Sequence, residues 1–147
     1  MSKTISYKGK VNIDVEEQIR LKTNTGKTGY KITKFQILST TPGVNSHELV
    51  GKVTSVPDPN VGPTVDLSNS DVLAVAYHTD LGNANVATSD SIIIDNAVVN
   101  QDVFVQIGNA TGGTTPANYY IEMETMPLND MEQTKLTLQS VRQLLSR

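Results

Sequence analysis

Polar and apolar residues alternate along the first fifteen positions of the chain. One face of this alternation carries Ile5, Tyr7, Gly9, Val11, Ile13 and Val15, and Lys8 and Lys10 fall on the other. A period of two indicates a strand with one buried face, because successive side chains of a strand point to opposite sides. The segment is therefore expected to be a half-buried antiparallel strand.

Similar short segments follow along the chain, separated by turn residues. The apolar positions in residues 19–21 lead into Asn24-Thr25-Gly26, residue types that tolerate turn conformations, so a hairpin is expected there. The next segment changes parity between Ile32 and Phe35, which predicts a bulge near residues 33–34. Further strands are expected at residues 49–56, 72–79, 91–95, 103–107 and 118–126.

The composition agrees with a fold built from strands. Val, Ile and Thr make up 43 of the 147 residues, and these β-branched types suit a pleated sheet. Residues 57–63 contain three prolines and cannot join a ladder, so they are expected to form a surface connection between two β blocks. The expected fold class is mainly β, an antiparallel β-sandwich or jelly-roll-like domain of about eight strands. Its clearest strand is the last, with Tyr119, Ile121 and Met123 facing inward.

The period changes after Pro127. Asn129 or Asp130 can cap a helix, with Glu132 or Gln133 three residues further on as in a capping box. Apolar residues then recur at helical spacing and predict a helix over residues 130–146 that packs on a sheet through Met131, Thr134, Leu138, Val141 and Leu145. Residues 1–127 are thus expected to form the sandwich and residues 128–147 a helix of the same domain.

Two leucines of this helix fall outside the apolar stripe. Leu136 lies nearly opposite the stripe on a helical wheel, and Leu144 lies to its side. Lys135 and Arg142 bring basic groups to the same segment. The helix is therefore a candidate attachment element that grips a neighbouring molecule through these four residues.

Charge is sorted along the chain. Residues 1–52 carry a net charge of +5, residues 53–134 carry −11 without any Lys or Arg, and residues 135–147 carry +3. If the fold keeps these segments apart, oppositely charged surfaces steer docking. If strands from the segments interleave, the charges average out over a solvated surface. The candidate docking residues are Lys8, Lys10, Arg20 and Lys22 on a positive side and Glu122 and Glu124 on a negative side.

Few residues point to catalysis or to metal binding. The chain has no Cys and only two histidines, His47 and His78, which fall in different predicted strands. No serine-nucleophile motif or phosphate-binding loop occurs, so no catalytic residue, cofactor or metal site is expected. The oxygen-rich segment Asp80–Asn85 lacks the closing carboxylate of a calcium loop, and turn chemistry accounts for its composition.

The overall charge and hydropathy narrow the class of partner. A sequence pI near 5.3 argues against general nucleic-acid binding, which needs a basic face. Apolar runs are only a few residues long, so neither a signal peptide nor a transmembrane span is expected. The expected partners are other proteins.

The C-terminal third, residues 95–147, combines several features in a fixed order. Asn100–Val105 is followed by a glycine-rich tip, by the strand Asn118–Glu124 and by Leu128–Asp130 at the start of a helix. This order resembles small virion structural proteins of tailed bacteriophages, especially those of marine bacteria. The resemblance implies a non-enzymatic, homo-oligomeric sandwich that decorates, cements or adapts a particle assembled in the cytoplasm of a host bacterium. It implies a major capsid protein or another virion protein as the partner.

Two other function classes stay open at this point. A carbohydrate-binding sandwich used in adsorption would need an exposed aromatic platform, and the chain has no Trp and seven aromatic residues in all. A small hydrolase would need a nucleophile beside a general base, and no motif in the sequence supplies that pair.

Overall fold

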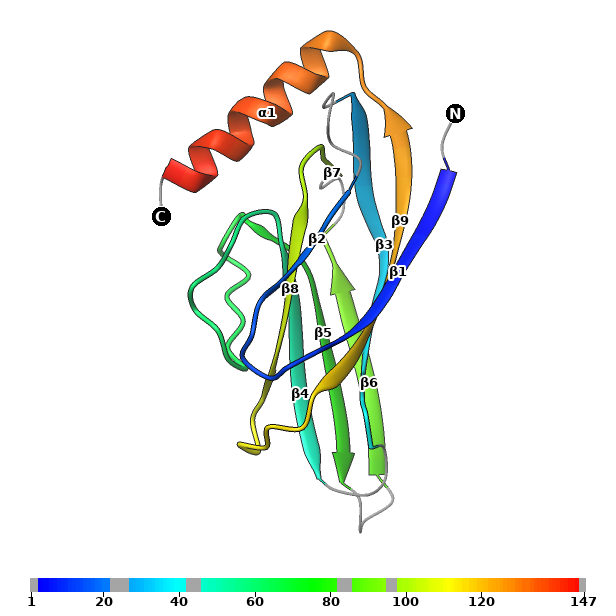
Figure 1. The fold of residues 1–147 in the computed structure, drawn as a ribbon, viewed down its shortest axis with the longest axis vertical. Helices are drawn as coiled ribbons and strands as arrows, with labels where there is room; N and C mark the ends of the chain where they lie inside the picture. The colour runs from blue at the N-terminus through cyan, green and yellow to red at the C-terminus, as the bar shows by residue number, and fades with distance from the viewer. Residues whose placement is uncertain (1–2, 22–26, 42–45, 82–85, 95–97, 146–147) are drawn as a thin grey trace.

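The computed structural model describes residues 3–21, 27–41, 46–81, 86–94 and 98–145. These residues form two antiparallel sheets with one helix at the C-terminal end, a mainly β sandwich as predicted (Figure 1). The strands and the helix are β1 (Lys3–Val11), β2 (Glu17–Ile19), β3 (Thr28–Ser39), β4 (His47–Thr54), β5 (Val72–Leu81), β6 (Val86–Ile93), β7 (Val98–Val99), β8 (Val103–Asn109), β9 (Ala117–Pro127) and α1 (Asp130–Leu145).

The two sheets differ in size and in strand order. The four-stranded sheet has the order β1-β9-β3-β7, and the five-stranded sheet has the order β2-β8-β4-β5-β6. The last strand therefore lies between the first and the third. The register between β3 and β9 shifts at Ile32/Lys34, which confirms the bulge predicted from the parity change.

One apolar core fills the space between the sheets. Its members from β9 are Tyr119, Ile121 and Met123, as the alternation predicts. Phe35 of β3 is fully buried against the five-stranded sheet, where small residues make room for it. A Cβ atom on Gly51 would come 3.0 Å from Cγ2 of Ile37 and 3.1 Å from the ring of Phe35, so a larger residue at this position would crowd these two core side chains.

The first strand is shorter than its alternation suggests. Pairing with β9 ends at Val11, and Asp14 then takes a left-handed conformation with φ of 62°. The amide of Asp14 donates to the carbonyl of Ile107 in β8 (2.9 Å), so the chain has already crossed to the other sheet. The prediction of one strand up to Val15 is wrong because this crossing needs a turn, and Asp tolerates a positive φ better than most residues.

The predicted hairpin is also wrong. The turn residues 24–26 lie outside the described residues, but the strands on either side of them do not pair with each other. β2 pairs with β8, and β3 pairs with β9 and β7. A third difference is β7, a two-residue strand opposite Tyr30 and Lys31 that is too short to show a period.

The helix forms where the sequence predicts it, and its cap is the expected box. The amide of Glu132 donates to Oδ1 of Asn129 (2.8 Å), and the amide of Asn129 donates back to Oε1 of Glu132 (3.2 Å). Two of the free amides at the start of α1 are therefore satisfied.

The face that α1 turns toward the domain is not the predicted one. Met131, Leu138 and Val141 are 82%, 51% and 47% exposed, so the predicted inward stripe faces solvent. The opposite side, with Leu136 and Thr137, is half-buried. A polar contact sets this orientation, because the amide of the buried Asn100 donates to Oγ1 of Thr137 (3.1 Å).

Candidate docking surfaces

A long loop, residues 55–71, lies over the outer face of the five-stranded sheet. Its backbone lies so close to β8 that a Cβ on Gly108 would come 2.3 Å from the carbonyl carbon of Gly62. Gly62 itself has φ of 123°, a conformation that favours glycine. Both glycines are needed for this close approach. The segment predicted as a surface connection is therefore a fixed layer on the sheet.

A buried ion pair fastens the loop to β4. Nζ of Lys52 lies 2.8 Å from Oδ2 of Asp58, and both side chains are almost fully buried. Nζ also donates to the carbonyl of Asn60 (3.0 Å), and Oδ1 of Asp58 accepts the amide of Asn60 (2.9 Å). Because the charges are paired and hydrogen-bonded, their burial is tolerated. One acidic group of the 53–134 segment is thereby neutralised inside the molecule.

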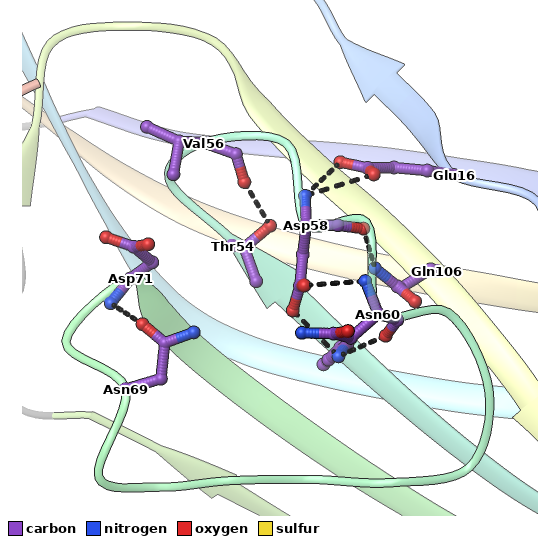
Figure 2. A network of polar contacts seen from close by, with 9 residues as sticks. Glu16, Thr54, Val56, Asp58, Asn60, Asn69, Asp71 and Gln106 are labelled. Atoms are coloured by element: carbon purple, nitrogen blue, oxygen red, sulfur yellow. Dashed lines mark hydrogen bonds and ion pairs between the residues drawn. The ribbon is translucent and has the colours of Figure 1, made fainter. Parts of the chain in front are cut away.

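Further contacts complete this network (Figure 2). The amide of Asp58 donates to the carboxylate of Glu16 (3.2 Å), and Nε2 of Gln106 donates to the carbonyl of Asp58 (3.3 Å). The two ends of the loop meet where the amide of Ser55 donates to the carbonyl of Asp71 (2.9 Å). These contacts hold the loop at its base and along its length, although the loop forms no ladder with a neighbouring strand.

The far side of this loop continues into an apolar patch on the outer face of the five-stranded sheet. Leu67, Tyr77 and Ile92 are 52%, 41% and 49% exposed. They surround a depression of about 210 Å³. The apolar patch comprises Val50 of β4, Val75 and Tyr77 of β5, Ile92 of β6, and Val65 and Leu67 of the loop.

The charges near the apolar patch are acidic. Asp90 lines the depression, Asp66 lies between the two loop residues of the patch, and Glu48 lies two residues before Val50 on β4. Among the Lys and Arg residues, β4, β5, β6 and the loop contain one, Lys52, and it is buried against Asp58. The patch is therefore an apolar surface with an acidic rim.

The outer face of the four-stranded sheet has a different character. Lys8 and Lys10 of β1 are exposed and lie opposite Tyr120 and Asn118 of β9. Glu122 and Glu124, on the same face of β9, lie opposite basic residues of β3, and Nζ of Lys34 comes 3.7 Å from Oε2 of Glu122.

Charge separation between Lys8 and Lys10 on one side and Glu122 and Glu124 on another is therefore wrong for this sheet. The insertion of β9 between β1 and β3 interleaves the two signs. Of the other predicted basic residues, Arg20 is exposed directly after β2 in the five-stranded sheet, and Lys22 lies outside the described residues.

The helix presents a second apolar surface. Between α1 and the body lies a groove of about 370 Å³, bordered by Val56, Pro57 and Phe104 on the body and by Thr137 and Val141 on the helix. α1 runs across one end of the sandwich instead of lying flat on a sheet (Figure 1).

The four attachment residues predicted on the helix have different surroundings. Lys135 and Arg142 are exposed, as an attachment role requires. Leu136 is half-buried on the side of the domain, so the prediction that it faces outward is wrong. The side chain of Leu144 lies outside the described part of the chain. Helical spacing alone assigns the longer apolar stripe to the inward side, and that assignment places Leu136 on the outward side.

The two histidines are neighbours inside the sandwich. His47 of β4 lies opposite Asp80 of β5, and Leu49 lies opposite His78, so both imidazoles belong to the same end of the sheet. Both are buried, and Nε2 of His78 has no hydrogen-bond partner within the described residues. Burial lowers the pKa of His78 more than the charge of Asp80 raises it, and His47 lowers it further.

Neither imidazole is placed at a metal centre. Among the described residues, no group of three or more His, Asp or Glu side chains is arranged to hold a metal ion. Most of the predicted oxygen-rich segment lies outside the described residues, and Asp80, which is described, is buried in β5.

No family model matches the chain, and no curated protein matches it. In the described ranges, α1 included, no helix has the length and apolar character needed to cross a bilayer.

Proposed function

We propose that this chain is a non-enzymatic virion structural protein that attaches to a phage particle through the apolar patch. The observation that carries the proposal is the patch itself. The core between the sheets is complete without Leu67, Tyr77 and Ile92, so these side chains are available to a partner. Contiguous exposed apolar residues with a polar rim are typical of protein interaction sites.

The surroundings of the patch support binding to another protein. Four of its residues belong to hydrogen-bonded strands, and the other two belong to the loop that Lys52 and Asp58 hold in place. A surface that is rigid before binding loses little conformational entropy on docking. The acidic rim of Glu48, Asp66 and Asp90 favours a partner with an apolar centre and basic edges.

The resemblance of residues 95–147 supplies the kind of partner. It points to a particle of a tailed bacteriophage, in which the patch would contact the major capsid protein or another virion protein. Repeated contacts across such a surface decorate, cement or adapt the particle. On this proposal the chain is made in the bacterial cytoplasm and ends as a component of the virion.

The experiment that tests the proposal follows the chain through particle purification and then weakens the patch. Ile92→Asp places a charge in the apolar patch and should lower affinity for the particle at least about tenfold. Leu38→Asp is the matched control, because Leu38 is 45% exposed, close to the 49% of Ile92, but lies on the four-stranded sheet. Bound protein is quantified by mass spectrometry of purified particles.

Two outcomes would contradict the proposal. The chain would be absent from purified particles, or Ile92→Asp and Leu38→Asp would bind them equally well. A glycan-binding signal that is lost with Tyr77→Ala would instead support the carbohydrate-binding class. Asp90 and Ser91 line the same depression as Tyr77 and are the polar groups that such a glycan would have to contact. Most of the other lining residues are aliphatic, and sugars need several directed hydrogen bonds besides an aromatic face, so this class is the weaker one.

A further inference from the structure

The solvent-facing side of α1 follows the spacing of a coiled-coil seam. Met131, Thr134, Leu138 and Val141 are separated by three, four and three residues. This is the alternation of a and d positions in a heptad, with Met131 and Leu138 at a and Thr134 and Val141 at d. The spacing continues in sequence to Leu145, whose side chain lies outside the described part.

This seam is exposed in the folded chain, although Val141 also borders the groove against the body, and the helix is held through the neighbouring f and g positions. Thr137 accepts a hydrogen bond from the buried Asn100, and Leu136 is half-buried beside it. In the heptad Leu136 is at position f, which faces away from the a and d seam. A second helix could therefore pack on the seam without displacing α1 from its own domain.

We infer that the seam binds α1 of a second copy of this chain, with the two helices parallel about a twofold axis. The charges of the helix support this occupant and this orientation. Asp130 is at a g position and Lys135 at the e position five residues later. In a parallel pair, g of one helix meets the following e of its partner, so two Asp130–Lys135 pairs form by symmetry.

The antiparallel arrangement is less favourable for the same charges. There e positions face e positions, which brings Lys135 of one copy near Arg142 of the other. Repulsion between these two cations replaces the two attractive pairs. The charges at the e and g positions thus favour the parallel pair of helices over the antiparallel pair.

The pairing is weak by itself and depends on local concentration. The described helix has 16 residues, about two heptads, which is short for a stable coiled coil. Copies held on one surface reach effective concentrations of about 1 mM, where weak contacts become populated. The inference concerns the helix alone and stays valid if the apolar patch has another partner.

Disulfide trapping tests the inference directly, because the chain has no native cysteine. In a parallel twofold pair each a residue faces itself, so Leu138→Cys and Met131→Cys should each form a symmetric intermolecular disulfide under mild oxidation. Gln139→Cys is the control, since the side chain of Gln139 is also exposed but lies off the seam. Equal trapping of the 138 and 139 variants would overturn the inference.

The Met131→Cys variant also decides the orientation. With the two seams in antiparallel register, the 131 positions are on the order of 15 Å apart along the axis, too far for a disulfide. Trapping by Leu138→Cys without trapping by Met131→Cys would therefore overturn the parallel pair.

Sedimentation of the full chain over a range of concentrations provides the second measurement. Leu138→Ser should raise the dimer dissociation constant at least about tenfold, because it removes an apolar contact from both helices. Lys135→Glu should raise it about fourfold, and adding Asp130→Lys to it should restore the original value. A wild-type chain that stays monomeric at about 1 mM would overturn the inference.

Discussion

Leu136 and Leu138 are two positions apart on α1 and have opposite surroundings. Because Leu138 is half-exposed in the monomer, Leu138→Ser should change the free energy of unfolding by less than about 0.5 kcal/mol. Leu136→Ser removes a half-buried side chain on the domain side and should cost about 1 kcal/mol. Urea unfolding of dilute protein measures both values. Equal losses of unfolding free energy in the two variants would mean that both sides of α1 are buried within one chain.

His78 makes the stability of the domain depend on pH. Its folded-state pKa lies below the ordinary value of 6.5, first because of burial, so the unfolded chain binds more protons below pH 6.5. The contribution of neutral His78 to the free energy of unfolding is therefore fully present above pH 6.5 and decreases as the pH falls through that value. The thermal midpoint should drop between about pH 7.5 and pH 5, and His78→Gln should reduce that drop. An unchanged slope in the variant would assign the pH dependence to other groups.

At the scale of elements, the stability of the domain is most sensitive to substitution at the ion pair that joins the 55–71 loop to β4. Lys52→Met leaves the buried carboxylate of Asp58 without its cation and should destabilise the domain by about 3–5 kcal/mol. Adding Asp58→Asn removes the unpaired charge, so the double variant should be more stable than Lys52→Met alone. Thermal unfolding of the wild-type chain, of Lys52→Met, of Asp58→Asn and of the double variant gives the coupling between the two residues. Simple additivity would show that the pair is not coupled.

Some elements could be predicted because their signals are local. The alternation of Tyr119, Ile121 and Met123 gives the inward face of β9, and the cap of Asn129 and Glu132 marks the start of α1. The parity change after Ile32 gives the bulge. Each of these depends on residues within a few positions of one another, where period and capping chemistry act directly.

The remaining features depend on partners far along the chain. The orientation of α1 is set by Asn100, thirty-seven residues before Thr137, and helical spacing does not reveal which face such a contact will select. The apolar patch was missed, although both parities of β5 are apolar from Val72 to Tyr77. That pattern indicates a strand covered on both faces, and in this molecule only part of the second face is covered by the loop.

For the whole molecule, the interleaved charges of the four-stranded sheet leave the acidic rim of the apolar patch as the principal candidate for electrostatic steering. Exposed charges are screened over about 8 Å at physiological salt, so the rate of attachment to particles should fall as salt rises. Changing Glu48, Asp66 and Asp90 to their amides should slow attachment at low salt and flatten its salt dependence. The matched change of Glu122 and Glu124 to Gln should have little effect.

Stopped-flow or surface-binding measurements on purified particles give these rates. Attachment rates of the wild-type chain that do not vary with salt would show that apolar contacts alone bring the partners together. A larger effect of the Glu122 and Glu124 variant on the attachment rate would show that the partner is attracted to the outer face of the four-stranded sheet instead.

The position of β9 also has a consequence in time. A nascent chain emerges from the ribosome with β1 and β3 first, and their shared neighbour β9 ends only at Pro127. Until then both strands present apolar faces and unpaired backbone groups, which are the features that lead unfinished chains to associate with one another. The four-stranded sheet therefore closes in a late step that places β9 between β1 and β3, and the interval before this step is when a chaperone would protect the protein most.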